Sequence, residues 1–276
     1  MVAQPELSVA LIGCGKMGSA LLRGWLSSPA IKHIYILDPV GLPDEFEDFV
    51  PDRITFFDKP ALFAGAHPKV SVFVVAVKPQ VLEEVCQEIK RTVSKDALVL
   101  SIAAGQKIAN FEKIFGAEQP IIRSMPNTPA AIGQGITVAC ANSPTQDQQR
   151  KTASQLLQAI GMVEWISDEN QMDAVTALSG SGPAYIFLLM EAMAAAGVKN
   201  GLPADFSMRL ARQTVIGSAA LAQEDHSPAA QLRQNVTSPG GTTAAALAVL
   251  MREDGIQKLF DEALSAATKR SQELSA

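Results

Sequence analysis

Cysteine, charge and aromatic side chains are all scarce in this sequence of 276 residues. Its three cysteines, Cys14, Cys86 and Cys140, lie far apart and form no CxxC pair, which argues against a disulfide framework or a zinc site. We expect them to be small buried hydrophobic residues in a reducing compartment. Charged residues make up 18% and hydrophobic residues 47%, so the chain can bury a large core and is not disordered.

A basic surface is also lacking. The balance of 23 Lys and Arg against 28 Asp and Glu gives a net charge of −5, and aromatics are 5%. These values argue against binding to nucleic acid or an anionic membrane. Glu6 stands where a signal peptide needs a basic residue, and no apolar run approaches the length of a membrane span. We therefore expect a cytoplasmic protein that acts on a small molecule.

Short apolar strands alternate with helices in residues 1–167. Near-continuous apolar runs such as 70–77 are typical of a parallel sheet covered by helices on both faces. Helices with apolar residues at three- and four-residue spacing are expected at 19–27, 81–93 and 145–160. Strands are expected at 8–12, 33–37, 53–56, 70–77, 97–102, 121–124, 136–141 and 162–166. This pattern predicts a doubly wound, Rossmann-type α/β domain.

Alanine- and leucine-rich helical stretches replace the strands in residues 168–276. Helices are expected at 170–178, 183–200, 204–223, 229–235, 242–253 and 256–274, separated by glycine and proline. Alanine-rich helices with few large side chains pack closely, and such bundles often complete their core with a second chain. We expect an all-helical substrate-binding and dimerisation domain, with a self-contained bundle as the alternative.

Residues 13–18, GCGKMG, fit the dinucleotide-binding pattern GxGxxG. They follow an expected strand and open an expected helix, which is the context that the mechanism requires. The first glycine permits a tight turn, the second lets the backbone approach a pyrophosphate, and the third lets helix and strand pack closely. The N–H groups at the start of the helix complete an anion site.

Asp38 follows the second expected strand, 20 residues after Gly18. A carboxylate there accepts hydrogen bonds from the adenosine ribose of NADH and repels the 2′-phosphate of NADPH. The alternative is that Asp38 only begins an Asp-Pro turn.

Three more loops follow strands: AVKPQ at 76–80, IAAG at 102–105 and MPNTP at 125–129. Ligands bind at the carboxyl ends of strands in open parallel sheets. Lys78 is suited to neutralising a phosphate, with a solvated loop lysine as the alternative. Asn127 and Thr128, between two prolines, offer a polar edge for a carboxamide or ribose. Together the loops outline a dinucleotide crevice.

The turn TSPGGTT at residues 237–243 precedes a helix without an acidic residue in its first turn. Its N–H and hydroxyl groups predict a site for a carboxylate. The alternative is N-capping by Thr242 or Ser238 without a ligand.

None of the three histidines, His33, His67 and His226, falls in a motif, and the expected helix at 183–200 has no basic residue before Lys199. A hydroxy-acid dehydrogenase needs such a residue to handle the alcohol proton. A C=N bond is less demanding, because a protonated imine needs only hydride and orientation.

The motifs GCGKMG, AVKPQ, SIAAG, MPNTP, LSGSGPAY and TSPGGTT, in this order, closely resemble those of the pyrroline-5-carboxylate reductases. The resemblance spans almost the whole chain. It implies reduction of 1-pyrroline-5-carboxylate to L-proline with NADPH or NADH, the last step of proline biosynthesis. It also implies a homodimer with interlocked helical domains, or a ring of such dimers.

The resemblance also implies roles for individual residues. Thr243 would be the catalytic residue, as an orienter or relay that donates a hydrogen bond to the substrate ring nitrogen, because a threonine is too weak an acid to protonate an imine unaided. Glu169 would be a substrate-side acid that balances the cation, or else only a helix-start carboxylate favoured by the dipole. The substrate set is Glu169, Ser238, Gly240, Gly241, Thr242 and Thr243. With the residues argued above, the cofactor set is Ile12, Gly13, Cys14, Gly15, Lys16, Met17, Gly18, Asp38, Asp58, Ala76, Val77, Lys78, Pro79, Ile102, Ala103, Ala104, Asn127 and Asn235.

Asp38 departs from the family pattern, because many NADPH-using members carry a small hydroxyl or an Arg there. The family default is NADPH and the local charge favours NADH, so we expect both to be accepted. Two alternative functions are another NAD(P)-dependent reductase of the hydroxy-acid dehydrogenase type and a non-catalytic dinucleotide-binding regulator. The regulator would not need the carboxylate-binding turn.

Overall fold

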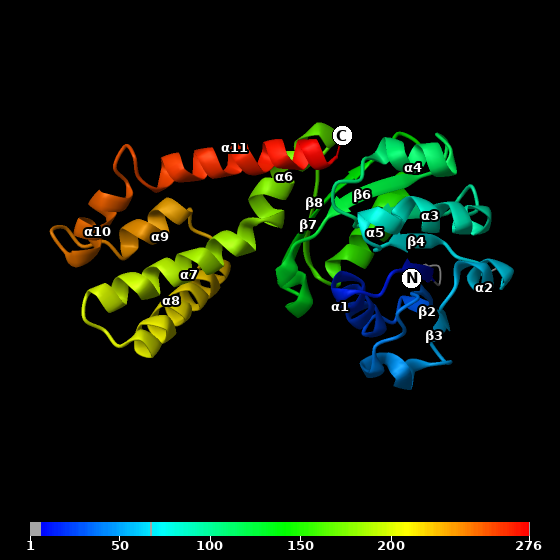
Figure 1. Ribbon diagram of the computed structural model, residues 1–276, viewed down its shortest axis with the longest axis horizontal. Helices are drawn as coiled ribbons and strands as arrows, with labels where there is room; N and C mark the ends of the chain where they lie inside the picture. Colours follow the sequence, from blue (N-terminus) through cyan, green and yellow to red (C-terminus); the bar gives the residue numbers. More distant parts are fainter. Residues whose placement is uncertain (1–6, 67, 276) are drawn as a thin grey trace. The chain divides into compact units, whose positions relative to one another are not determined.

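The computed structural model describes residues 7–66 and 68–275, so Glu6 and His67 of the sequence argument lie outside the described residues. The chain divides into two compact units, which are described separately (Figure 1). The first comprises Met1–Gly180 and Thr268–Ala276, and the second comprises Ser181–Ala267. The functional boundary between residues 167 and 168 stays a prediction.

An eight-stranded sheet forms the centre of the first unit, in the order β3-β2-β1-β4-β5-β6-β7-β8. All neighbouring strands run parallel except β6 and β7, which are antiparallel. The expected Rossmann-type fold is confirmed, and β7 and β8 extend its far edge as predicted. The strands are β1 (Leu7–Ile12), β2 (Ile31–Leu37), β3 (Ile54–Phe57), β4 (Val72–Val75), β5 (Leu98–Ser101), β6 (Ile121–Met125), β7 (Gly135–Ala141) and β8 (Gly161–Trp165).

Helices cover both faces of this sheet. Apolar residues of α1 (Lys16–Leu26) and α5 (Asp147–Gln158) pack on one face. Those of α2 (Pro60–Gly65), α3 (Pro79–Ile89) and α4 (Ile108–Phe115) pack on the other. The sequence argument missed α2 and α4, which are short. Short 3-10 turns complete the unit: η1 (Asp44–Phe49), η2 (Lys90–Thr92), η3 (Thr128–Ile132) and η4 (Glu169–Gln171).

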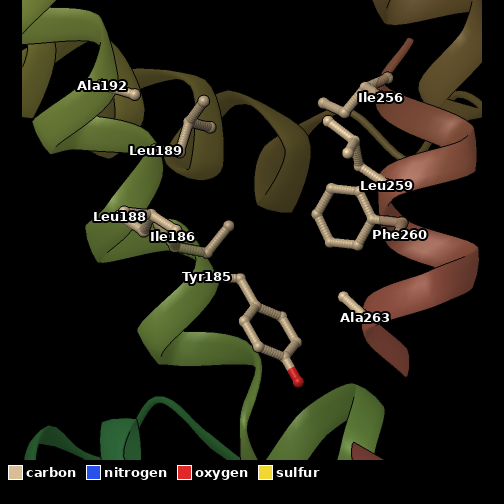
Figure 2. Close-up of a pocket in the computed structure, with 9 residues that line it drawn as sticks. All are labelled: Tyr185, Ile186, Leu188, Leu189, Ala192, Ile256, Leu259, Phe260 and Ala263. Carbon is tan, nitrogen blue, oxygen red and sulfur yellow. The ribbon is translucent and has the colours of Figure 1, made fainter. Parts of the chain in front are cut away.

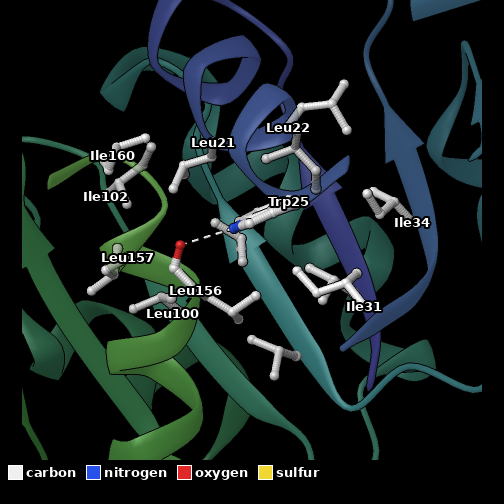
Figure 3. Packing of buried hydrophobic residues seen from close by; sticks show 14 of the residues in the cluster. Leu21, Leu22, Trp25, Ile31, Ile34, Leu100, Ile102, Leu156, Leu157 and Ile160 are labelled. Atoms are coloured by element: carbon white, nitrogen blue, oxygen red, sulfur yellow. Dashed lines mark hydrogen bonds between the residues drawn. The ribbon is translucent and has the colours of Figure 1, made fainter. Parts of the chain in front are cut away.

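Trp25 is the largest side chain in the core of the α1 and α5 face (Figure 3). It is 1% exposed, and its indole N–H donates a hydrogen bond of 2.9 Å to the carbonyl of Leu156. A buried indole needs such a partner, because an unpaired N–H loses its bond to water. This contact ties the last turn of α1 to α5.

The helix expected at 170–178 is divided in the structure. After η4 come α6 (Met172–Val175) and a π-helical turn, η5 (Thr176–Gly180). Gly180 lies close to Met125, because a Cβ at this position would approach the Met125 methyl carbon within 2.7 Å. The π-helical turn therefore ends where the chain packs closely against Met125.

The second unit consists of helices, as expected. They are α7 (Gly182–Lys199), α8 (Ala204–Glu224), α9 (Ala229–Asn235), α10 (Thr242–Leu250) and the first part of α11 (Ile256–Leu274), whose last turns belong to the first unit. The expected helix 242–253 is three residues too long, because a turn at Gly255 follows the end of α10.

Many apolar side chains of this unit are exposed, among them Phe187 at 57% and Leu188 at 63%. One helical stretch among the described residues, Glu169–Lys199, is long and apolar enough to cross a membrane, which the sequence argument did not anticipate. A single such stretch is weak evidence of a membrane protein, since helices of soluble proteins pass the same test.

Candidate active site

The carboxyl ends of β1, β4 and β5 bring three of the predicted loops together. The N–H of Ala76 donates to the carbonyl of Ile12 at 2.8 Å, and the N–H of Ile102 donates to that of Val75 at 3.0 Å. β1 has β2 on one side and β4 on the other, so the strand order reverses at β1. This is the position at which doubly wound folds bind their ligands.

The three glycines of the first loop behave as the motif requires. Gly13 has φ +99°, and a Cβ there would lie 2.8 Å from the carbonyl oxygen of Ala76. A Cβ on Gly18 would lie 2.3 Å from the carbonyl oxygen of Gly13, so the first turn of α1 packs directly on the loop. A Cβ on Gly15 would meet no atom within 4 Å. The loop is therefore open only where a pyrophosphate is expected.

The start of α1 offers unpartnered backbone donors. Its N-cap residue, Gly15, makes no side-chain cap, and the first turn contains no acidic residue. The first N–H groups of a helix have no partner within the helix and attract anions. These donors and the open space at Gly15 fit the pyrophosphate of a dinucleotide.

Asp38 is 9% exposed and does more than begin a turn. Its Oδ2 accepts a hydrogen bond of 2.6 Å from the N–H of Cys14, and its Oδ1 accepts one of 2.8 Å from the N–H of Val40. Asp38 therefore both begins the turn after β2 and contacts the glycine loop. Each carboxylate oxygen has a second acceptor position, so the residue can also bind hydroxyl groups.

The other predicted cofactor residues of the first unit follow strands of the sheet, whereas Asn235 lies in the second unit. Asp58, which is exposed, follows β3, and Lys78 is exposed as the N-cap of α3. The Asn127 side chain is already engaged, because its Oδ1 accepts from the N–H of Ile136 at 3.0 Å and its Nδ2 donates to the carbonyl of Ser179 at 3.2 Å. Asn127 therefore holds its loop, with one amide hydrogen left for a ligand.

In the second unit, the turn before α10 matches the predicted carboxylate site. Gly240 has φ +72°, and the N–H of Gly241 donates to the carbonyl of Ser238 at 3.0 Å. Gly241 is the N-cap of α10 and no side chain caps it, so the alternative of capping by Thr242 or Ser238 is not observed. Elsewhere in this unit Asn235, at the end of α9, accepts a hydrogen bond from Gln231.

Glu169 lies in the first unit beside a basic residue that the sequence argument missed. Its Oε1 lies 2.8 Å from Nη1 of Arg123, whose side chain is only 5% exposed. The same oxygen accepts a hydrogen bond of 2.9 Å from the N–H of Ile108, at the start of α4. Arg123 interrupts the apolar strand β6, and this lone charge was the signal available in the sequence.

The cysteines and His33 lie outside the predicted cofactor and substrate sites, except for Cys14, which is part of the glycine loop. All three cysteines are free and buried, as expected, and burial raises the pKa of the Cys86 thiol to about 12. Partial burial lowers the pKa of His33, whose ring bonds to the hydroxyl of Thr55 at 2.8 Å. No group of three or more His, Cys, Asp or Glu that could hold a metal ion occurs within residues 7–66 and 68–275.

The strand-end glycine loop, with open space and free N–H donors, defines a Rossmann-type dinucleotide-binding protein that carries a helical second domain. Comparisons with known families agree with this class. Residues 8–105 match the family described as NADP oxidoreductase, coenzyme F420-dependent, and residues 169–274 match the pyrroline-5-carboxylate reductase dimerisation domain.

Whole-chain relatives identify the family. A pyrroline-5-carboxylate reductase of Pseudomonas aeruginosa is 40% identical and aligns over 96% of both chains. The solved structure of the Coxiella burnetii pyrroline-5-carboxylate reductase has a TM-score of 0.89 at 36% identity, covering 98% of this chain and 99% of that one. The Plasmodium falciparum pyrroline carboxylate reductase, solved with NADP bound, has a TM-score of 0.80 at 30% identity, covering 99% and 100%. The chain belongs to the pyrroline-5-carboxylate reductase family, so the predicted oxidoreductase class is confirmed.

The glycine loop can be tested with two matched substitutions. Gly15→Ala should fold normally, because its Cβ meets no atom, yet weaken cofactor binding about tenfold or more by filling the space for the pyrophosphate. Gly18→Ala should lower the free energy of unfolding by about 1–3 kcal/mol, because its Cβ overlaps the Gly13 carbonyl. Urea unfolding and fluorescence titration with NADPH separate the two effects. Equal loss of stability in both variants would contradict this assignment.

Proposed function

We propose that this protein reduces the C=N bond of 1-pyrroline-5-carboxylate to give L-proline, with the cofactor at the carboxyl edge of the sheet. Family membership supports the reaction, which is the last step of proline biosynthesis. The observation that carries the cofactor site is the glycine loop, in which only Gly15 faces open space. When bound, the dihydronicotinamide supplies the hydride.

The pyrophosphate would bind the N–H groups at the start of α1, with Ile12 to Gly18 forming the loop around it. Asp38 and Asp58 would lie near the adenosine half, and Lys78 would face a phosphate. The small residues 102–104 leave room for a flat ring beside the backbone. In the second unit, Asn235 is proposed to contact the cofactor.

The carboxylate of the substrate would bind the turn at 238–243. The free N–H groups at the start of α10 and the bend at Gly240 support this assignment. Ser238 and Thr242 would add hydroxyl donors. Thr243 would donate a hydrogen bond to the imine nitrogen and relay to it, from water, the proton that it needs as the hydride adds to the ring carbon. Holding the imine in a fixed orientation lowers the barrier by reducing the entropy lost in reaching the transition state.

The function is tested by following NAD(P)H oxidation with 1-pyrroline-5-carboxylate beside a panel of 2-keto acids. We expect turnover with the imine and none with the keto acids, because no described His or Lys lies in the proposed substrate turn. Turnover with keto acids alone would favour the hydroxy-acid dehydrogenase alternative. Cofactor binding without any turnover would favour the regulator.

Asp38 should set the cofactor preference. Both cofactors should be accepted, and a kcat/KM at least about a hundredfold better with NADPH would refute this expectation. Asp38→Asn keeps an acceptor for the Cys14 N–H but removes the charge, so it should shift the kcat/KM ratio about tenfold toward NADPH. Asp38→Ala removes the acceptor as well, and should weaken binding of both cofactors.

Thr243 should matter for turnover and not for cofactor binding. Thr243→Val removes the hydroxyl while keeping the shape, and we expect kcat to fall about 10- to 100-fold with an unchanged Kd for the cofactor. Thr243→Ser retains the hydroxyl and is the control. A loss of cofactor affinity in Thr243→Val would instead assign Thr243 to the dinucleotide site.

A homodimer through the helical domain is supported by the match to the dimerisation family and by an apolar groove in the second unit (Figure 2). Residues of α7 line one side and residues of α11 the other, with the rings of Tyr185 and Phe260 6.2 Å apart edge to face. Leu259 in this groove is 62% exposed. Such a surface is typical of one that pairs with another chain.

We further propose that the dimers assemble into rings and that the protein is cytoplasmic. The covered apolar faces would explain the membrane-like hydropathy of 169–199 without a membrane. Light scattering should give at least twice the chain mass of 29.2 kDa, and a monomer would contradict the dimer.

A further inference from the structure

The Arg123–Glu169 ion pair has no part in the reaction as proposed above, although the family resemblance implies a substrate-side role for Glu169. Arg123 is buried in β6, and the 2.8 Å contact with Glu169 compensates its charge. A buried cation without its partner is costly, so the position of Glu169 is fixed by Arg123. The pair therefore holds Glu169, 46 residues further along the chain, against the sheet.

The same Glu169 oxygen also accepts a hydrogen bond from the start of α4. The N-cap of this helix, Lys107, makes no side-chain cap, and the first turn has no acidic residue. The N–H of Ile108 is satisfied by Glu169 Oε1 at 2.9 Å. Glu169 thus supplies from a distant segment the acceptor and negative charge that a helix start normally takes from its own cap.

What this contact fixes is the loop that runs from β5 to α4. β5 ends at Ser101 and α4 begins at Ile108, so six residues, 102–107, lie between them, including the small residues proposed to line the nicotinamide. The first end of the loop is held by the bond from the Ile102 N–H to Val75 and by the bond from the Ala103 N–H to the Ser101 hydroxyl, at 3.2 Å. Glu169 holds the other end.

Arg123 connects this loop to its neighbour. It is paired in register with Ser101 across β5 and β6, and it lies two residues before the end of β6 at Met125, after which the Asn127 loop begins. One ion pair therefore reaches the two loops that follow β5 and β6.

We propose that Glu169, held by Arg123, is a positioning residue that fixes the loop 102–107 for the nicotinamide half of the cofactor, and that it does not contact the substrate. This inference rests on the proposed function, because it assumes that the loop lines the nicotinamide. It excludes the substrate-side role of Glu169 and differs from the helix-start alternative, because the helix whose start Glu169 contacts is α4 and not its own.

The decisive measurements are cofactor Kd by titration without substrate, and KM for each substrate. Glu169→Ala should raise the NADPH and NADH Kd about tenfold and leave KM for 1-pyrroline-5-carboxylate within about threefold of wild type. Glu169→Gln keeps an oxygen that accepts from the Ile108 N–H, so the cofactor Kd should stay within about threefold of wild type. It leaves the buried charge of Arg123 uncompensated, so it should lower the free energy of unfolding. The control is Asp168→Asn, which removes the adjacent exposed charge but keeps an Oδ1 acceptor for the Asn170 N–H, and it should change neither constant.

The double variant Arg123→Met/Glu169→Met separates an effect on folding stability from an effect on cofactor binding. Replacing both charges by apolar groups of similar size should recover much of the stability lost in Glu169→Ala. It still leaves the Ile108 N–H without an acceptor, so cofactor affinity should remain low. Hydrogen exchange in a peptide covering 102–108 should be faster in both variants than in wild type.

Three results would overturn the proposal. The first is a raised KM for 1-pyrroline-5-carboxylate with unchanged cofactor Kd in Glu169→Ala. The others are an equal loss of cofactor affinity in Glu169→Gln and Glu169→Ala, and recovery of cofactor affinity in the double variant. The first would return Glu169 to the substrate side. Because Kd is measured without substrate, failure of wild type to reduce the imine would count against the proposed function alone.

Discussion

The contact between the first turn of α1 and the glycine loop sets the geometry of the first unit. Gly18 lies against the Gly13 carbonyl so closely that no side chain fits. This packing aims the free N–H groups of α1 at the space over Gly15, and Trp25 on the same helix anchors α1 to α5. The position of the predicted pyrophosphate site is thus set by close packing, and a change in this packing would move the N–H groups at the start of α1.

The two units differ in how far they bury their apolar side chains. The sheet of the first unit buries strands such as β4 and β5 completely. The helices of the second unit bury very few residues: only Ala194 in α7 and none in α10. The low charge of the chain therefore has two structural settings, a covered sheet in the first unit and exposed apolar helices in the second, where the matched family is a dimerisation domain.

Sequence patterns predicted the strands well because each buried strand is a short apolar run between turn residues. They missed α4, whose eight residues carry only three buried positions, Ile108, Phe111 and Ile114. They placed a single helix at 170–178, where contact between Gly180 and Met125 accompanies a π-helical turn. The glycine motif revealed the cofactor loop, since glycine spacing encodes backbone geometry. The partnership of Arg123 with Glu169 was hidden, because no local pattern links residues that meet only in the folded chain.

Asp38 carries a consequence for how cofactor choice can evolve. Its carboxylate ties the loop after β2 to the loop after β1 through the N–H groups of Val40 and Cys14. Discarding this carboxylate to admit a 2′-phosphate also unties the two loops. A change of coenzyme at this position is therefore restricted to side chains that lose the charge and still accept from the Cys14 N–H, unless another acceptor is supplied elsewhere.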